Sequence, residues 1–340
     1  MPTAADTAAD KKHSAMNAEQ FRAHLLGWYD AHARDLPWRK NRDPYRVWVS
    51  EIMLQQTRVA AVIEHYHEFL RRFPTVEKLA RAREASVVAA WSGLGYYRRA
   101  RMMHAAAKVI VRKRGVKFPS TSEGWRELPG IGRYTAAAIA SIAFDEPVAV
   151  VDGNVERVLQ RWLGHWLNGE ELWTAAAALL DRTRPGDFNQ AMMELGATVC
   201  TPRAPICLTC PVHHSCAARG ELAGAVKPAP QKKREVHYAL HVRGANSHGE
   251  IFLVQRATEA SLMAGMWELP EIVPPNGGAK SDFTVRHSIT ITDYTVHVWR
   301  RPLRERVAGR WISTHQMKKI PLTGLTRKII RKAGLLHPNP

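Results

Sequence analysis

The sequence predicts a multidomain chain in which an all-α part comes first and a smaller α+β part follows it. Apolar residues recur at helical spacing over residues 17–220, whereas segments over residues 236–340 alternate between apolar and polar side chains as strands do. Between them, residues 221–235 are rich in Ala, Pro, Lys and Gly, which is typical of a linker. A length of 340 residues also favours more than one domain.

The overall charge indicates a polyanionic partner. The chain has 49 Lys and Arg against 31 Asp and Glu, a formal net charge of +18 at pH 7. One basic run is most often a solvated face, but a total this far from neutral is typical of proteins that bind nucleic acid. No apolar run is long enough to span a membrane. Residues 1–16 contain no apolar signal-peptide segment, so we expect a disordered tail on a cytoplasmic, nucleoid-associated protein of bacterial type.

The first helix and the connector behind it carry aromatic and basic residues. The spacing of Phe21, Leu25 and Tyr29 predicts an amphipathic helix with Asn17 as its cap. The connector RDLPWRKNRDPYRVW follows it. Two interpretations of its arginines are equally open, namely a loop packed on the core and a contact with a DNA backbone.

One long helix is expected over residues 46–71, and it contains an unusual carboxylate. At helical spacing Glu51, Gln55 and Arg58 would share one face. A lone Glu on a helix is usually solvated. Here apolar residues flank Glu51 on both sides, in VWVS and IML, so we expect partial burial and a raised pKa.

A glycine-rich loop, WSGLGYYRR, lies beyond the next expected helix. Glycines alternate with Leu94 and Tyr96, and Arg98 and Arg99 come directly after them. Such a loop can present wedge-shaped and stacking side chains next to charges that attract phosphate. A core hairpin covered by a Tyr fits the same residues equally well.

The centre of the chain is the segment LPGIGRYTAAAIASIAFDEPVAVVDGN, residues 128–154. Gly130 and Gly132 can adopt positive φ in a tight turn, and the alanine-rich helix that opens there leaves backbone N–H groups free to bind phosphate. Further along, Asp152 stands directly ahead of the next helix, with Asn154 as the expected cap. A helical hairpin with a capping Asp explains this segment equally well when it is taken alone.

The four cysteines all fall within residues 200–216, at the spacing Cys200-x6-Cys207-x2-Cys210-x5-Cys216. Thiols gathered in so short a segment indicate a metal site. Zinc is the usual intracellular metal, but it prefers two close cysteine pairs, and only one C-x2-C pair is present. The uneven spacing favours an iron–sulfur cube instead, with His213 and His214 on the surface.

Six motifs in the same order resemble the helix-hairpin-helix DNA glycosylases, and among them the MutY-type adenine DNA glycosylases. They are LPWR (residues 36–39), SEIMLQQT (50–57), GLGYYRR (93–99), LPGIGRYTA (128–136), VDGNV (151–155) and the cysteine spacing. The resemblance is close over residues 20–220 and loose over residues 235–340.

The resemblance implies how the chain is divided. Residues 17–36 and 148–220 would form a helical domain that holds one 4Fe-4S cluster, and residues 37–147 a six-helix barrel with the helix-hairpin-helix. After a linker, residues 236–340 would form a Nudix-like domain that senses 8-oxoguanine. This last part lacks the acidic REUxEExGU box of Nudix hydrolases, so nucleotide hydrolysis is not expected.

The same resemblance implies a reaction in base excision repair. A monofunctional glycosylase would flip adenine out of double-stranded DNA and excise it opposite 8-oxoguanine or guanine. Glu51 resembles the acid that protonates adenine N7, and Asp152 the carboxylate that stabilises oxocarbenium charge on the deoxyribose. Tyr134 would assist at the sugar and Asn154 would orient the site. We expect a monomer on one duplex.

Further residues match family positions at the DNA or at the base pocket. They are Gln56 and Thr57 in SEIMLQQT, the wedge residues Leu94 and Tyr96, Gly130 and Gly132 at the DNA backbone, and Arg34, Arg39 and Glu194 at the pocket. One departure concerns the contact with 8-oxoguanine, where many members have Phe-Ser-His and this chain has Ile289-Thr290-Ile291. Thr290 is the candidate replacement for the Ser hydroxyl, so we expect weaker or differently built lesion discrimination.

Relatives with other activities remain as alternatives. The bifunctional endonuclease III type carries Lys where this chain has Tyr134, so strand cleavage is not expected. A thymine–guanine mismatch glycosylase shares the Tyr and the Asp but generally lacks the Glu and the Nudix-like domain. A non-catalytic damage-binding protein would need neither Glu51 nor Asp152.

Overall fold

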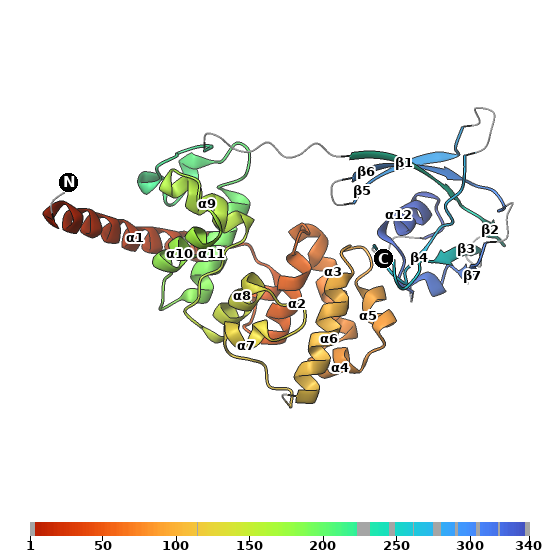
Figure 1. Ribbon diagram of the computed structural model, residues 1–340, viewed down its shortest axis with the longest axis horizontal. Coiled ribbons are helices and arrows are strands. Elements are labelled where there is room, and N and C mark those ends of the chain that lie inside the picture. The colour runs from red at the N-terminus through yellow and green to blue at the C-terminus, as the bar shows by residue number, and fades with distance from the viewer. Residues whose placement is uncertain are drawn as a thin grey trace. The chain divides into compact units, whose positions relative to one another are not determined.

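The computed structural model divides into two compact units, coloured along the chain in Figure 1. One unit consists of Met1–Gln56 and Val109–Val226, and the other of Thr57–Lys108 and Lys227–Pro340. The residues whose structure is described are 4–113, 115–222, 232–244, 249–260, 262–274, 280–289, 292–303, 307–318 and 320–336. This division differs from the expected one, which kept residues 37–147 together, because Thr57–Lys108 clusters with the C-terminal region.

The first unit is helical and is arranged around α8 and α11. Its helices are α1 (Ala4–His32), α2 (Pro44–Leu54), α7 (Ser122–Arg126), α8 (Arg133–Phe144), α9 (Gly153–Leu163), α10 (Gly169–Leu179) and α11 (Pro185–Thr198), with the 3-10 turns η1 (Pro37–Arg39), η2 (Cys207–Thr209) and η3 (His213–Ser215). Helix α11 packs against α1, α8 and α9, and α8 packs in turn against α2 and α7. The small side chains of α8 allow neighbours on every side, and residues 135–142 are all buried.

Several helix boundaries differ from the expected ones. Helix α1 begins at Ala4 instead of Asn17 and so runs through the segment expected as a disordered tail, which agrees with the high helix propensity of its alanines. The long helix expected over residues 46–71 is wrong. Helix α2 ends at Leu54 and α3 begins at Val59, because Gln56 adopts a left-handed φ of 54° between them. Glu51, Gln55 and Arg58 therefore do not share one helical face.

The second unit combines helices with the strands of the C-terminal region. Its helices are α3 (Val59–Arg72), α4 (Val76–Arg81), α5 (Glu84–Ala90), most of α6 (Arg98–Lys113), the 3-10 turn η5 (Gln316–Lys318) and α12 (Gly324–Lys332). Strand β6 (Thr292–Trp299) lies between β1 (Lys232–Ala239), which is parallel to it, and β5 (Phe283–Ile289), which is antiparallel. Strand β3 (Glu250–Gln255) pairs antiparallel with β2 (Val242–Arg243), β4 (Trp267–Glu268) and β7 (Arg310–Ser313).

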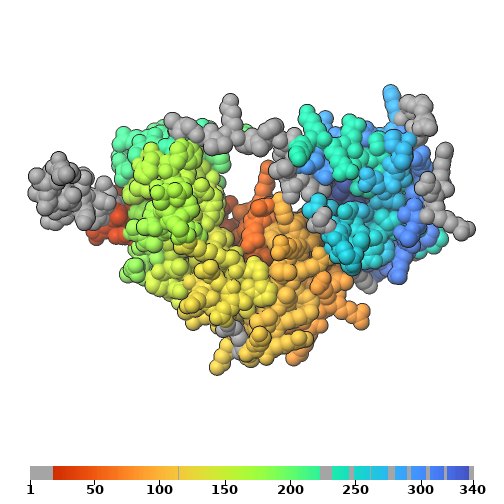
Figure 2. All heavy atoms as spheres, viewed as in Figure 1, coloured from red at the N-terminus to blue at the C-terminus, as the bar shows by residue number. Residues whose placement is uncertain are grey.

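The apolar face of α12 closes the core of the C-terminal region. Leu325, Ile329 and Ile330 of this helix are buried in one cluster with Val236 of β1 and Ile251 of β3. In Figure 2 the atoms of the C-terminal region are coloured from blue-green to blue. The α+β class expected for this region is therefore confirmed. Within the described residues, no helix combines the length and the apolar character that crossing a membrane requires.

Candidate active site

Glu51 is a buried carboxylate on α2. Asp43 caps this helix, because its side chain accepts a hydrogen bond of 2.8 Å from the N–H of Arg46. The helix packs on α8, and Glu51 is left only 5% exposed. Its Oε2 atom accepts a hydrogen bond of 2.8 Å from the hydroxyl of Tyr134 on α8. The burial expected from the apolar flanks of Glu51 is therefore confirmed.

The surroundings of Glu51 hold its pKa close to neutral. Burial is the largest influence and raises the pKa, the hydrogen bond from Tyr134 lowers it, the charge of Asp152 raises it, and the charge of Arg39 lowers it. Together they raise the pKa of Glu51 from 4.5 to about 7. A carboxyl group in this range is protonated in a substantial fraction of molecules at neutral pH and can act as a general acid.

Tyr134 stands in the first turn of α8, directly behind the glycine turn. Gly130 adopts a φ of 76°, as expected, but Gly132 is extended at −88° and serves as the helix cap without a side chain. Burial, together with the charges of Glu51 and Asp152, raises the pKa of Tyr134 well above its usual value of 10. The hydroxyl therefore stays protonated and acts as a hydrogen-bond donor to Glu51.

Asp152 itself caps α9, so the expectation that Asn154 would do so is wrong. The Oδ1 atom of Asp152 accepts from the backbone N–H groups of Asn154 at 2.9 Å and Val155 at 2.8 Å. The Oδ2 atom accepts from the side-chain amide of Asn154 at 2.9 Å. Three donors thus orient one carboxylate at the N-terminus of a helix, where the helix dipole favours negative charge.

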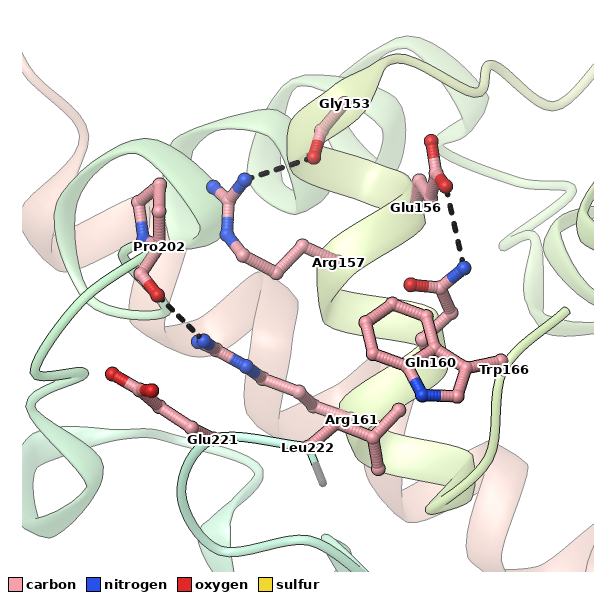
Figure 3. A pocket seen from close by; sticks show the side chains of 9 residues that line it. All are labelled: Gly153, Glu156, Arg157, Gln160, Arg161, Trp166, Pro202, Glu221 and Leu222. Carbon is pink, nitrogen blue, oxygen red and sulfur yellow. Dashed lines mark hydrogen bonds between the residues drawn. The ribbon is translucent and has the colours of Figure 1, made fainter. Parts of the chain in front are cut away.

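Arg157, which the sequence does not single out, connects this carboxylate to the cysteine segment. Its guanidinium donates to Asn154 Oδ1 at 2.9 Å, to the carbonyl oxygen of Gly196 at 2.7 Å and to that of Cys200 at 2.7 Å. Figure 3 shows the side chain reaching back along α9 to Gly153. Four bonds to carbonyl and amide oxygens make Arg157 a structural part of the site. No sequence neighbour distinguishes Arg157 from the other arginines of the chain, so sequence reasoning missed it.

Gly196 lies at the closest approach of α11 to α9. A glycine near the end of a helical segment is often its stop, but α11 continues past Gly196 to Thr198. A Cβ atom on Gly196 would stand 2.6 Å from the Cβ atom of Asn154 and 2.8 Å from its carbonyl oxygen. The glycine is needed because the backbone of α11 touches the residue that orients Asp152.

Gly196→Ala is expected to destabilise the protein by about 1–3 kcal/mol, the usual cost of forcing extra volume into a packed contact. Urea unfolding measures the loss. Gly169→Ala is the matched control, because nothing lies within 4 Å of a Cβ atom there and alanine has the higher helix propensity. Equal midpoints for the two variants would contradict the close approach of α11 to α9.

Glu194 fixes the arginine-rich connector to α11. This carboxylate is 1% exposed and accepts from Arg34 Nε at 2.6 Å, from Arg34 Nη2 at 2.7 Å and from Arg39 Nη2 at 2.9 Å. Burial raises the pKa of Glu194, but the two guanidinium groups outweigh it and hold that pKa below its usual value. Both arginines also line a pocket of about 320 Å³. Of the two interpretations of the connector, the packed loop agrees with these contacts.

The residues expected beside the partner base fall in different parts of the chain. Gln56 lies in the turn after α2, and its left-handed φ of 54° separates this helix from α3. The wedge loop (Gly93–Tyr96) belongs to the second unit. The side chain of Tyr96 is 46% exposed there, whereas that of Leu94 is only 6% exposed. Thr57 accepts a hydrogen bond of 3.3 Å from Arg99. Thr290 lies outside the described residues.

The four cysteines belong to one segment, residues 200–216, which lies against the end of α9. All four thiols are free and partly buried. Burial raises the pKa of the Cys207 thiol, and the nearby Cys200 and Cys216 raise it further. Burial also raises the pKa of the Cys210 thiol to about 11, and the other three cysteines add to this effect. Four sulfur donors that influence one another suit a metal group held by thiolates.

Among the described residues, no group of three or more His, Cys, Asp and Glu side chains could hold a metal ion. Arg161 anchors the segment to α9 by donating to the carbonyl oxygens of Thr201 at 2.7 Å and Pro202 at 3.0 Å, the latter visible in Figure 3. Arg161 also donates to Cys200 Sγ at 3.4 Å.

Comparison with known proteins places the chain in a family. The family model described as HhH-GPD superfamily base excision DNA repair protein matches residues 49–179. The adenine DNA glycosylase of Buchnera aphidicola subsp. Schizaphis graminum is 37% identical over 255 residues, covering 72% of this chain and 73% of that protein. The chain belongs to the adenine DNA glycosylase family. Among other members, the Rattus norvegicus adenine DNA glycosylase is 40% identical over 317 residues and 76% of this chain. The chain spans 61% of the length of that rat protein.

Solved structures agree on the helical fold of this family. A thermostable thymine-DNA glycosylase matches 61% of the chain and 98% of its own length, with a TM-score of 0.57 and 29% sequence identity. An endonuclease III bound to DNA matches 59% of the chain with a TM-score of 0.52. At 22% identity the second likeness shows the fold alone. The helical glycosylase fold expected from the motifs is therefore confirmed.

Proposed function

We propose that the chain is a monofunctional adenine DNA glycosylase that excises adenine paired with 8-oxoguanine or guanine in double-stranded DNA. The observation that carries the proposal is the buried acid Glu51, whose pKa is raised to about 7 and whose carboxyl group accepts from Tyr134. An acid poised near neutral pH is what protonation of a leaving base requires. Membership of the adenine DNA glycosylase family supports adenine as that base.

In the proposed reaction, Glu51 donates its proton to adenine N7. The bond between the base and C1′ of the deoxyribose then breaks, and its electron pair leaves with the base. Adenine departs as a neutral species, and the sugar is left with oxocarbenium charge. Asp152, held by its three donors, stabilises that charge, as the second carboxylate does in glycoside hydrolysis. Water adds to C1′, and the Glu51 carboxylate accepts the proton that this water releases.

The adenine has to leave the base stack before this chemistry can begin. The glycine turn before α8, with Gly130 at positive φ, presents free backbone N–H groups that suit a DNA phosphate. Tyr96 is the exposed side chain of the wedge loop and can stack beside the partner base. The C-terminal region is proposed to contact 8-oxoguanine, with Thr290 as the candidate residue.

We propose that Cys200, Cys207, Cys210 and Cys216 hold one 4Fe-4S cluster. The single C-x2-C pair and the uneven cysteine spacing support a cluster over zinc. When bound, the cluster would fix the segment next to Arg157 and leave the reaction to Glu51 and Asp152. Iron and acid-labile sulfide analysis should give four of each per chain. One zinc per chain would overturn the assignment.

The decisive experiment measures single-turnover base release from duplexes with adenine opposite 8-oxoguanine, guanine or thymine. We expect fast release in the first two cases and little in the third. A duplex with thymine opposite guanine tests the alternative favoured by the likeness to a thymine-DNA glycosylase. Release of thymine without release of adenine would replace the proposal by that alternative. Binding without release of either base would indicate a damage-binding protein.

Tyr134→Phe should move the pH dependence of excision to higher pH. The reaction needs protonated Glu51, so the rate falls as pH rises through the pKa of Glu51, which is about 7. The Tyr134 hydrogen bond lowers that pKa, and its removal should raise the midpoint by about one pH unit, the usual effect of one bond to a charged group. Tyr45→Phe, which removes a buried hydroxyl from α2, should leave the midpoint in place. A midpoint moved to lower pH would contradict the role of Tyr134.

Tyr134→Lys should create strand cleavage that needs no alkali. A lysine at this position would place an amine beside the sugar and burial would lower its pKa, so that it could form a Schiff base with the opened deoxyribose. Gel separation of duplexes treated with wild type and variant, without an alkaline step, measures the nicked fraction. Absence of nicking, in a variant that still binds duplex, would count against the placement of Tyr134 at C1′.

A further inference from the structure

The wedge loop is bordered by two buried hydroxyl groups that share one acceptor. Ser92 precedes the loop and is 6% exposed, and Tyr97 follows it and is 4% exposed. Both donate to the main-chain carbonyl oxygen of Leu322, Ser92 at 2.9 Å and Tyr97 at 3.2 Å. A carbonyl oxygen has two lone pairs and can accept both bonds. Leu322 belongs to the C-terminal region, so each end of the wedge loop is bonded to that region.

A third side chain completes this contact from the C-terminal side. Arg327 on α12 donates through Nε to the Ser92 hydroxyl at 3.2 Å. Its guanidinium is largely buried, and a buried charge is retained only where polar groups meet it. Ser92 is thus both donor to Leu322 and acceptor from Arg327. Ser92, Tyr97 and Arg327, together with the Leu322 carbonyl, are called the Leu322 contact below.

The acceptor sits on a rigid part of the C-terminal region. Thr323 caps α12 by accepting from the N–H of Thr326, and both threonines are at most 2% exposed. On either side of Leu322, the backbone is bonded to Trp267 of β4: Trp267 donates to Pro321 at 2.8 Å, and Thr323 donates to Trp267 at 3.0 Å. A displacement of β4 or of α12 would therefore displace the Leu322 carbonyl too.

The wedge loop itself is held in an unusual conformation. Gly93, Gly95 and Tyr96 have φ values of 115°, 71° and 47°, and a positive φ is costly for a tyrosine. Arg99 supports the loop by donating to the carbonyl oxygens of Leu94 and Gly95, each at 3.3 Å, and by lying 5.4 Å from the centre of the Tyr96 ring. Such strain persists only where several contacts fix it. Arg99, expected to seek phosphate, is one of these contacts, and the Leu322 contact supplies the others.

We propose that Ser92, Tyr97 and Arg327 are positioning residues that tie the wedge loop to the C-terminal region, so that recognition of the base opposite the adenine determines how firmly the loop is held. This inference rests on the proposed function, because it takes the C-terminal region as the reader of 8-oxoguanine. When the partner is 8-oxoguanine, the contact of that region with the base holds the Leu322 carbonyl and hence Tyr96 in place. With guanine as partner, that added constraint is absent.

Tyr97→Phe tests the inference with a minimal change, since it removes one donor and keeps the ring. Single-turnover excision should fall about tenfold opposite 8-oxoguanine, the effect of one buried hydrogen bond, and less than about twofold opposite guanine. The ratio of the two rates should therefore fall. Ser92→Ala should lower the same ratio, and the double variant should lose less than the product of the two single losses, because both donors serve one acceptor. Tyr238→Phe is the matched control from β1, with a tyrosine 8% exposed, and should keep the wild-type ratio.

A purely structural role would lower both rates equally, together with the melting temperature, and that result would overturn the inference. An unchanged ratio in both Tyr97→Phe and Ser92→Ala would overturn it as well. Hydrogen exchange of the DNA-free protein gives a readout that does not depend on activity: amides of residues 93–97 and 322–327 should exchange faster together in Tyr97→Phe, and faster exchange of only one segment would contradict the tie. Failure of the wild type to release adenine from either duplex would instead refute the proposed function.

Discussion

Glu51→Gln is expected to lower the single-turnover rate of adenine excision by about 10²- to 10⁴-fold, the range contributed by general acid catalysis. The amide has nearly the size of the carboxyl group, and its oxygen can still accept the 2.8 Å bond from Tyr134. It has no acidic proton to give to N7, so the base would have to leave as an anion. Duplex binding, measured by fluorescence anisotropy, should change little.

Glu64→Gln is the matched control for this variant. Glu64 is an exposed residue on α3, and the substitution makes the same carboxyl-to-amide change without touching the site. It should keep the wild-type rate. Because Glu51 carries a pKa of about 7, the difference between wild type and Glu51→Gln should be largest below pH 7 and should narrow above it. Wild-type turnover in the Glu51→Gln variant would show that Glu51 is not the general acid of the reaction.

The burial of Glu51 could be predicted from the sequence because the signal is local. Apolar residues on both sides place it on a helix that has no polar face, and desolvation of a carboxylate raises its pKa wherever this occurs. The wrong helix boundary nearby has an equally local cause. The segment Gln55-Gln56-Thr57 contains neither glycine nor proline, the residues that usually signal the end of a helix. The left-handed φ of Gln56, which ends α2, therefore has no sequence signature.

Contacts between residues far apart in the chain could not be predicted. Gly196 is a helix stop by its sequence context, but the structure places it against Asn154, on another helix. Arg157 has no distinguishing neighbours, yet it bonds to oxygens of Asn154, Gly196 and Cys200. Partners of this kind are fixed by helix packing, and a single sequence carries no information on which helices meet.

The compact units of the structure also depend on contacts that the motifs do not reveal. Motif and composition boundaries suggest that residues 57–108 belong with the helices that follow them in sequence, whereas the structure groups them with residues 227–340 in one compact unit. The bonds of Ser92 and Tyr97 to Leu322 join residues more than two hundred positions apart. Each residue is unremarkable by itself, and only the fold brings them together.

Asp152→Asn is expected to slow excision by about 10²- to 10³-fold, the effect of removing one electrostatic stabiliser from a developing charge. Asparagine is as good a helix cap as aspartate, so Oδ1 can still accept from the N–H groups of Asn154 and Val155. The melting temperature should therefore change little while the rate falls. Part of the loss comes from the new amide, since its NH2 would meet the side-chain amide of Asn154, which donates to Asp152 Oδ2 in the wild type.

Asp43→Asn is the matched control for Asp152→Asn. It removes the charge of a capping carboxylate away from the sugar, and so separates the effect of capping from the effect of charge at the reaction site. Asp43 caps α2 as Asp152 caps α9, by accepting from a backbone N–H, and it is exposed. The two substitutions should have similar, small effects on thermal unfolding, whereas only Asp152→Asn should slow base release. If both variants released adenine at the wild-type rate, capping would be the whole role of Asp152. The oxocarbenium charge would then need another anion, and the Glu51 carboxylate that remains after proton transfer would be the candidate.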